Sequence, residues 1–192
     1  MSSQNIEIEF KNMLTKDEYR KLINTFELEE SAKKSQENHY FDTKDFLLKS
    51  KGCALRIRHK HGSYEMTLKQ PYEENLLETN QQLTTAEAEE MIRTGRLLNG
   101  KIKKYIEEMN IHPSHLIYFG SLKTDRIEIS YKDGILVFDH SFYLNQEDYE
   151  LEYEVNDRKK GAEIFKELLD NLNIPVRKTE NKIKRFYDAR YQ

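Results

Sequence analysis

The sequence has little of several residue types, and each shortage excludes a class of protein. Its 192 residues include one cysteine, Cys53, with 3 prolines, 7 glycines and no tryptophan. A single cysteine excludes an intramolecular disulfide framework and a zinc site made of several thiolates, and it suits a reducing compartment. Because proline and glycine are scarce, no stretch looks like a linker. We therefore expect residues 1–192 to form a single domain.

Long apolar runs and a charge excess of one sign are also missing. No stretch approaches the roughly 18 consecutive apolar residues of a membrane-spanning helix. Residues 1–10 lack the basic and apolar regions of a signal peptide. The 31 basic and 34 acidic residues give a net charge of −3, without the positive excess of many nucleic-acid-binding proteins. We expect a cytoplasmic protein that binds neither nucleic acid nor membrane, and monomer and homodimer both stay open.

Hydrophobic periodicity predicts a mixture of strands and helices. The expected strands are 6–11, 39–42, 47–50, 54–60, 64–70, 117–122, 124–131, 135–143, 149–155 and 182–187. The expected helices follow Thr15 and then cover about 86–93, 99–109 and 160–172. This order predicts an α+β fold with a mainly antiparallel sheet. About eight strands are enough to close a β-barrel.

Alternation along these strands separates charged from apolar residues, because residues i, i+2 and i+4 share one face of a strand. Strand 6–11 has Glu7, Glu9 and Lys11 on one face, with isoleucine and phenylalanine on the other. Periodicity alone favours an ordinary sheet with its charged face in water. Strand 149–155, however, has Glu150, Glu152 and Glu154 about 6–7 Å apart on one face. Like charges this close repel unless cations bridge them, which favours hard divalent ions with oxygen ligands.

Basic residues are sorted onto other strands. They are Arg56, Arg58, Lys69, Arg126 and Lys182. Inside a barrel these side chains would converge on one anion of several negative charges, since Arg and Lys both bind phosphate oxygens. No G-x-x-x-x-G-K-[ST] string is present, so a polyphosphate site here has to be made of side chains.

The charged strands carry a series of motifs in a fixed order. The order is E-x-E-x-K at 7–11, Tyr40-Phe41-Asp42-Thr43, Leu55-Arg56-Ile57-Arg58, Thr67-Leu68-Lys69, Arg126, Phe138-Asp139, Glu150-Leu151-Glu152 and Asn181-Lys182-Ile183. This series resembles the CYTH domain, also called the triphosphate tunnel metalloenzymes, over about residues 6–186. The opening string alone is weakly specific, but the ordered set is strongly specific.

The resemblance implies a closed antiparallel eight-stranded tunnel with a polar interior and helices packed outside. It implies that a triphosphate is bound by Lys11, Arg56, Arg58, Lys69, Arg126 and Lys182, with Lys184 and Arg185 as further candidates. It also implies that Mg²⁺ or Mn²⁺ is bound by Glu7, Glu9, Asp139, Glu150 and Glu152. Glu9, Glu152 and Lys11 are the expected catalytic residues.

Two departures from the family pattern leave roles open. The last motif often reads Ser-Lys-Tyr, whereas this chain has Asn181-Lys182-Ile183, so the last phosphate ligand could be Lys182, Lys184 or Arg185. Glu154 extends the acidic row and could be a metal ligand or lie at the tunnel mouth.

Asp42 and Thr43 are expected to form a turn with local backbone hydrogen bonds.

The resemblance leaves three functions open. The leading hypothesis is a metal-dependent triphosphatase that acts on inorganic triphosphate or a small organic triphosphate such as thiamine triphosphate. The second is a class IV-type adenylate cyclase, which would need an adenine pocket that the sequence does not reveal. The third is a non-catalytic polyphosphate- or nucleotide-binding module, which would not require so many metal ligands.

Overall fold

The structure is a computed structural model that describes residues 2–191. Its strands are β1 (Ser2–Leu14), β2 (Lys34–Thr43), β3 (Ala54–Lys60), β4 (Ser63–Tyr72), β5 (Asn75–Leu83), β6 (Leu116–Tyr131), β7 (Gly134–Tyr143) and β8 (Gln146–Val155). Its helices are α1 (Lys16–Thr25), α2 (Leu47–Ser50), α3 (Thr85–Thr94), α4 (Lys101–Glu108), α5 (Arg158–Asn171) and α6 (Lys182–Tyr191), with 3-10 turns at Glu30–Ala32 and Pro113–His115. Among these residues, every helix is too short or too polar to span a bilayer.

The strands form one sheet that closes on itself. Their order is β1-β5-β4-β3-β2-β6-β7-β8, which is a closed barrel. Neighbours such as β3 and β4, or β7 and β8, run antiparallel. The expected α+β fold with an eight-stranded antiparallel barrel is therefore confirmed.

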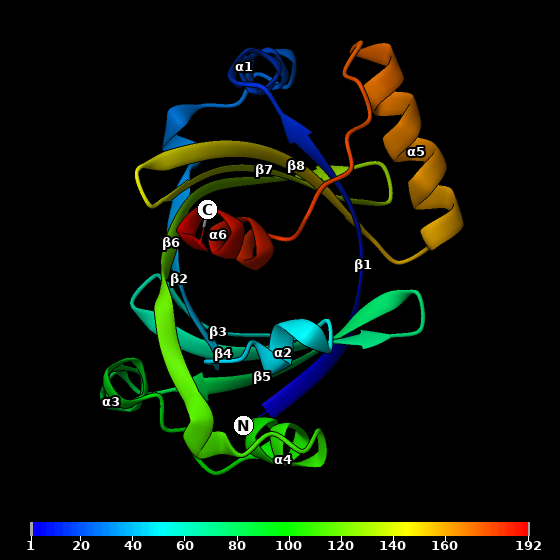
Figure 1. The fold of residues 1–192 in the computed structure, drawn as a ribbon. Coiled ribbons are helices and arrows are strands. Elements are labelled where there is room, and N and C mark those ends of the chain that lie inside the picture. The colour runs from blue at the N-terminus through cyan, green and yellow to red at the C-terminus, as the bar shows by residue number, and fades with distance from the viewer. Residues whose placement is uncertain (1, 192) are drawn as a thin grey trace. The chain divides into compact units, whose positions relative to one another are not determined.

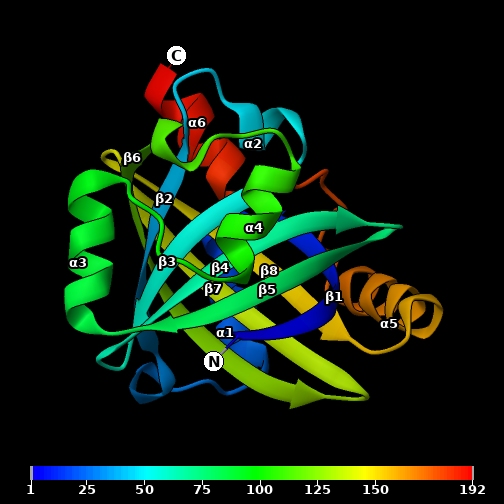
Figure 2. The same ribbon diagram turned by 90° about the horizontal axis from the view of Figure 1, so that it is seen from below.

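The chain divides into two compact units. Unit 1 contains the chain up to Ile6 and Gln36–Leu122, and unit 2 contains Glu7–Ser35 and the chain from Lys123 onward. In unit 1, one face of β2, β3, β4 and β5 is apolar, and helices α3 and α4 cover it (Figure 2). The core of this unit includes Ile57, Met66 and Leu68 from the strands, together with Met91 and Ile106 from the helices.

Unit 2 is built in the same way. One face of β7 and β8 packs against α1 and α5, whereas α6 lies on the other side of these strands (Figure 1). The buried core on the α1 and α5 side includes Phe138, Leu151 and Tyr153 from the sheet, with Leu22 and Phe165 from the helices. In both units, alternation leaves the opposite face of the strands to polar side chains.

The C-terminal segment corrects one prediction. Residues 182–187 were expected to form a strand, but they belong to helix α6. The buried residues Ile183, Phe186 and Tyr187 recur at helical spacing, and the side-chain oxygen Oδ1 of Asn181 accepts a hydrogen bond from the backbone N–H of Lys184. The alternation of Lys182 and Lys184 around Ile183 was therefore misread as a strand pattern.

Three further elements differ from the expectation. Residues 47–50 form helix α2 in place of a strand, because the Asp42 carboxylate accepts hydrogen bonds from the backbone N–H groups of Leu48 and Lys49. The local backbone hydrogen bonds expected of Asp42 and Thr43 are present, but both residues end strand β2 and the turn follows at residues 44–45. Residues 117–122 and 124–131 are one continuous strand, β6. Strand β5 was not predicted, since polar residues occupy both of its faces over 78–82.

Candidate functional site

Four neighbouring residues form the centre of a charged cluster on the polar face of unit 2. In the strand register, Arg126 of β6 lies opposite Asp139 of β7, and Asp139 lies opposite Glu150 of β8. Glu152 follows on the same face of β8. Arg126, Asp139, Glu150 and Glu152 are 8%, 0%, 0% and 3% exposed. A sheet with its charged face in water is therefore excluded for this unit.

Cations from two strands pair with these carboxylates. Arg126 binds Asp139 in a bidentate way, with Nε–Oδ1 at 2.7 Å and Nη2–Oδ2 at 2.6 Å. Its Nη2 also donates to Glu152 Oε2 at 2.8 Å. On β1, Lys11 Nζ lies 2.8 Å from Glu9 Oε1 and 3.3 Å from Glu152 Oε1. Burial of a charge is tolerated only with such partners, so these ion pairs allow the charged groups to be buried.

Helix α6 supplies two more cations. Lys182 Nζ lies 2.8 Å from Asp139 Oδ2, 2.9 Å from Glu150 Oε2 and 2.7 Å from Glu152 Oε1. Arg185 Nη2 donates to Glu150 Oε2 at 2.7 Å. Lys184, the third C-terminal candidate, is turned away from the cluster. It pairs with Glu180 and Asp188 on its own side of the helix.

The pKa values follow from burial and from these charges. Burial alone would raise the carboxyl pKa of Glu152, but Lys11, Lys182 and Arg126 outweigh it and hold this pKa well below its ordinary value. Burial likewise opposes the charge on Lys182, yet Asp139, Glu150 and Glu152 raise the pKa of its ammonium. Glu154 differs, because burial and the Glu152 carboxylate raise its pKa to about 7. Most of the cluster is therefore charged at neutral pH, while Glu154 titrates there.

The cluster has the donor chemistry of a hard divalent cation. Within residues 2–191, no three or more His, Cys, Asp or Glu side chains already adopt a metal-binding arrangement. The carboxylates Asp139, Glu150 and Glu152 face lysine and arginine instead. Glu150 Oε1, however, is buried without a hydrogen-bond partner. Carboxylate oxygens are the ligands that Mg²⁺ and Mn²⁺ prefer, so these residues fit such an ion.

The remaining expected metal ligands lie on β1. Glu9 stands opposite Glu154 in the β1–β8 register, and its side chain is 8% exposed. Glu7 lies two residues earlier on the same strand and is half-buried. Its carboxylate is one of the charges that raise the pKa of Glu154. Both residues therefore belong to the acidic end of this face.

A second cluster occupies the polar face of unit 1. Arg56 of β3 and Lys69 of β4 share the carboxylate of Glu78 on β5, at 3.7 Å and 2.8 Å from Glu78 Oε1. Burial opposes ionisation of Glu78, but Lys69 and Arg56 lower its pKa to about 2. Next to them, Arg58 Nε donates to Asn38 Oδ1 at 2.9 Å. Two of the three expected phosphate ligands of this unit therefore share one carboxylate, and the third is oriented by Asn38.

Sequence reasoning missed Glu78, Asn38 and Asp148 as members of these clusters. Asp148 accepts hydrogen bonds from Arg185 at 2.9 and 3.2 Å. The available signal was weak. Glu78 lies in an unrecognised strand, and Asn38 precedes the segment that was read as a strand at 39–42. Asp148 also precedes its expected strand, so Asn38 and Asp148 lay just outside a recognised alternation.

The CYTH domain model matches residues 5–187. The chain belongs to the CYTH domain family. YjbK of Bacillus subtilis (strain 168), which is named as a candidate triphosphatase, is 46% identical over 188 residues, covering 98% of this chain and 97% of YjbK. The triphosphate tunnel enzymes of this family depend on metal for activity.

Solved CYTH structures share this fold. A candidate adenylate cyclase of Bacillus halodurans is 42% identical, with a TM-score of 0.93 over 96% of this chain and 98% of that one. HpAC1 of Hippeastrum, a candidate adenylyl cyclase with a dominant triphosphatase activity, is 20% identical, with a TM-score of 0.77 over 98% and 96% of the two chains. At that identity the HpAC1 likeness shows a common fold.

Proposed function

We propose that this CYTH protein is a divalent-metal-dependent triphosphatase that hydrolyses a phosphoanhydride bond of inorganic triphosphate or a small organic triphosphate. The observation that carries the proposal is the buried carboxylate set Asp139, Glu150 and Glu152, which fits a hard cation, in a chain 46% identical to a candidate triphosphatase. Phosphoryl transfer depends mainly on positioning and charge neutralisation. Such chemistry needs no Ser, Cys or His nucleophile.

The residues have separate roles in this proposal. Arg56, Arg58 and Lys69 bind phosphate oxygens, as do Lys11 and the cations of unit 2, namely Arg126, Lys182 and Arg185. Glu7, Glu9, Asp139, Glu150 and Glu152 bind Mg²⁺ or Mn²⁺. When bound, the metal supplies charge neutralisation and a more acidic water. Lys184, which faces Glu180 and Asp188, has no role at the phosphate.

Lys11 has a particular place among these cations. Its Nζ touches the carboxylates of Glu9 and Glu152, and burial is outweighed by these two charges, which raise its pKa well above the ordinary value. Lys11 therefore stays protonated at neutral pH and holds a fixed positive charge beside the proposed metal ligands.

The protein further acts as one CYTH domain, as a monomer or homodimer in the cytoplasm, without nucleic-acid or membrane partners.

A second candidate function is adenylate cyclisation. It is favoured by the 42% identity to the Bacillus halodurans protein, which is named as a candidate adenylate cyclase. Hydrolysis and cyclisation share the triphosphate and metal requirements but differ in the attacking oxygen. Water attacks phosphorus in hydrolysis, whereas the ribose 3′-oxygen attacks the α-phosphorus in cyclisation.

One experiment separates the functions. Purified protein is incubated with inorganic triphosphate, thiamine triphosphate or ATP, in Mg²⁺ or Mn²⁺. Orthophosphate release supports the triphosphatase; cyclic AMP with pyrophosphate supports the cyclase; binding without turnover contradicts both. Glu9→Ala and Glu152→Ala are expected to abolish turnover with a smaller effect on binding, and Arg58→Ala to weaken triphosphate binding. Wild-type turnover in either glutamate variant would remove these residues from the metal assignment.

A further inference from the structure

Asn12 is a buried polar residue in an otherwise apolar row of β1. Alternation places it on the face of Ile8, Phe10 and Leu14, and it is 0% exposed. Burying an amide costs free energy unless its groups are hydrogen-bonded. Asn12 Nδ2 donates to Met13 O and to Pro175 O, both at 3.1 Å, and Asn12 Oδ1 accepts from the backbone N–H of Arg177 at 2.6 Å. The amide therefore serves to bind the segment around residue 176.

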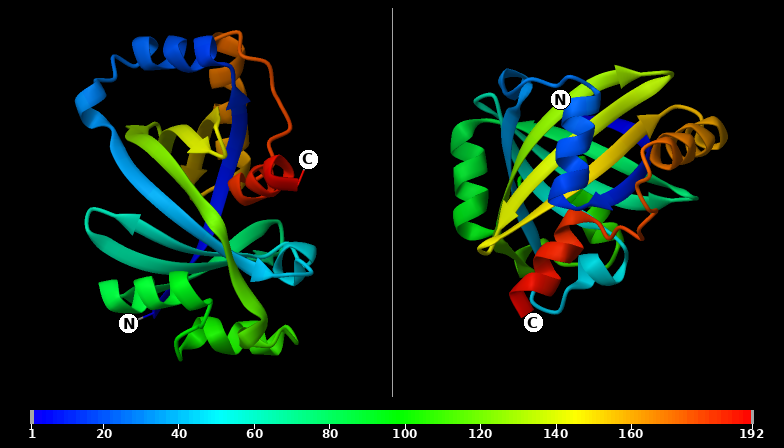
Figure 3. Two further views of the ribbon diagram at one scale, coloured as in Figure 1. Left: turned by 60° about the vertical axis from the view of Figure 1, so that its left-hand side comes forward. Right: turned by 90° about the horizontal axis from the view of Figure 1, so that it is seen from above.

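That segment, residues 175–179, is called the strap here, because it runs beside the end of β1 on its way from α5 to α6 (Figure 3). Two more residues fix it. Thr179 Oγ1 accepts from the backbone N–H of Met13 at 2.9 Å. Arg177 Nη1 donates to Met13 O at 2.9 Å. The strap is thus bonded to β1 through both side-chain and backbone groups.

Arg177 also joins the strap to α1. Its guanidinium binds the Glu18 carboxylate in a bidentate way, at 2.8 and 2.9 Å, and this pairing lowers the pKa of Glu18. Glu18 accepts from the backbone N–H of Thr15 in the capping box of α1. The start of α1 and the strap therefore share one ion pair, with side chains 33% and 18% exposed.

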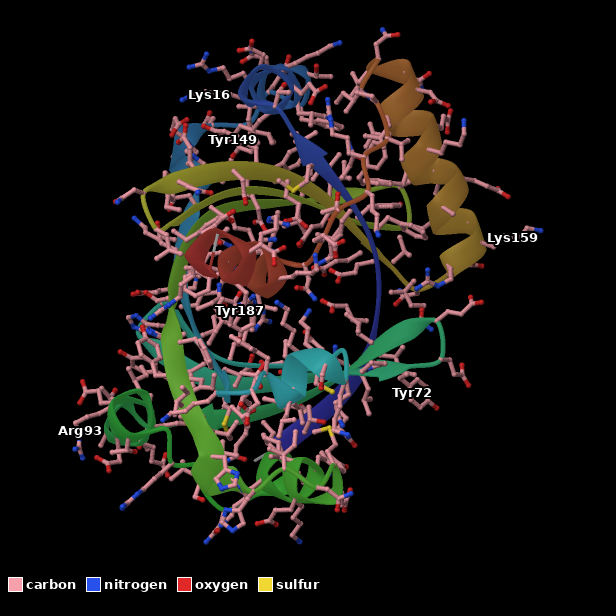
Figure 4. All side chains as sticks on the ribbon, viewed as in Figure 1. Lys16, Tyr72, Arg93, Tyr149, Lys159 and Tyr187 are labelled. Carbon is pink, nitrogen blue, oxygen red and sulfur yellow. The ribbon has the colours of Figure 1, made fainter. Side chains whose placement is uncertain are left out.

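The strap determines where α6 begins. Only Glu180 and Asn181 separate Thr179 from Lys182, and two intervening residues allow a reach of about 10 Å. The body of α6 is held by apolar residues, including Tyr187, which Figure 4 labels on the helix. The N-terminal end of α6, at Lys182, is held in place by the strap that precedes it. Lys182 Nζ then meets the three carboxylates of Asp139, Glu150 and Glu152 at 2.7–2.9 Å.

We infer that Arg177 and Thr179 are positioning residues that place Lys182 in the acidic cluster through the strap, to which Asn12 is also bonded. The inference rests on the proposed function, because it assigns Lys182 to the phosphate and the carboxylates to the metal. The hydrogen bonds of Asn12 and Arg177 go to β1, to α1 and within the strap, and not to the carboxylates that Lys182 meets. A loosened strap frees Lys182 from the carboxylates. Metal alone then binds more tightly, because a competing ammonium is gone, and triphosphate binds more weakly, because a cation is misplaced.

The test compares Arg177→Met with Lys178→Met in the full-length protein. Lys178 is the neighbouring strap residue, its side chain is 90% exposed, and it makes a 3.7 Å pair with Glu180. Thr179→Val is a second strap variant that removes the hydroxyl bonded to Met13. Arg177→Lys keeps the positive charge, so its exchange and KM should lie between those of the wild type and Arg177→Met. The readouts are amide hydrogen exchange of α6, Mn²⁺ affinity without substrate, and the KM and kcat for inorganic triphosphate.

In both Arg177→Met and Thr179→Val, we expect amide exchange of α6 and the KM for triphosphate each to rise by about tenfold. We expect Mn²⁺ to bind more tightly in both variants and kcat to stay nearly unchanged. Lys178→Met should match the wild type in all readouts. Wild-type exchange in α6 of both strap variants overturns the inference, as does faster exchange with unchanged KM and Mn²⁺ affinity. If the wild-type protein does not hydrolyse triphosphate, the proposed function is wrong. In that case the exchange and Mn²⁺ results alone decide whether the strap places Lys182.

Discussion

The carboxylate of Glu78 offers a quantitative test of the cation cluster in unit 1. Its side chain is 11% exposed and lies 2.8 Å from Lys69 Nζ and 3.7 Å from Arg56 Nη2. Asn5 Nδ2 donates to its other oxygen at 3.5 Å. Although burial disfavours the charged form, Lys69 and Arg56 lower the pKa from 4.5 to about 2. Since one pKa unit is about 1.36 kcal/mol, ionised Glu78 stabilises the fold by about 3 kcal/mol at pH 7.

The perturbation is Glu78→Gln, which keeps the shape of the side chain and removes its charge. We expect a loss of about 3 kcal/mol in the free energy of unfolding at pH 7, since two mostly buried cations lose their counter-ion. The folded-state pKa is depressed, so this stabilisation is present above the unfolded pKa near 4.5. It is lost as pH falls from there towards 2. The difference between wild type and variant should therefore shrink over that range.

Urea unfolding followed by circular dichroism measures both quantities, at pH 7 and in steps down to about pH 3. Glu89→Gln is the matched control, because Glu89 is exposed on α3 in the same unit, and it should change stability by less than about 0.5 kcal/mol. The reasoning fails if Glu78→Gln is as stable as the control at pH 7. It also fails if the gap stays constant on acidification, since a constant gap would reflect packing and not charge.

Three further predictions test the metal and the local structure. Treatment with EDTA should abolish triphosphate hydrolysis, and Mn²⁺ or Mg²⁺ should restore it and raise the melting temperature; full activity in EDTA contradicts the metal requirement. Gly95→Ala should destabilise the protein by more than about 2 kcal/mol in thermal unfolding, because φ is +72° and the new Cβ would lie 2.3 Å from Leu116 O. Gly62→Ala, at φ +74° with nothing within 4 Å, should cost about 1 kcal/mol by strain alone, and equal losses would argue against the clash. Thr84→Ala should cost about 1 kcal/mol by removing the capping box of α3 with Glu87, and an unchanged melting temperature would show that this cap adds no stability.

Local rules predicted the parts of the fold that depend on neighbours in sequence. Alternation sorts Glu9 and Lys11 from Ile8 and Phe10 whatever the strand pairs with, because successive side chains point to opposite faces. The hairpin turn before Gly134 and the capping box of Thr15 with Glu18 likewise depend only on residues close in sequence. The ordered motifs on these strands were sufficient to predict the family and the eight-stranded barrel.

Short segments with mixed patterns were decided by contacts that are distant in sequence. Residues 182–187 became a helix because Ile183, Phe186 and Tyr187 are buried together, and no local signal distinguished this from alternation. Strand β5 has polar residues on both faces, and it was recognisable only through its pairing with β4, as Lys69 opposite Glu78 shows. Propensity is a weak guide for such segments, since tertiary packing overrides it.

The sequence by itself therefore determined which residues carry charge on which strand face, because that follows from a two-residue period along one strand. Only the tertiary structure decided which charges meet. Lys182 reaches Asp139, Glu150 and Glu152 from a helix at least 30 residues further along the chain, and Asn12 finds two of its partners at Pro175 and Arg177. A carboxylate row looks the same in sequence whether metal, lysine or arginine faces it, because Coulomb attraction depends on distance in space and not on separation along the chain.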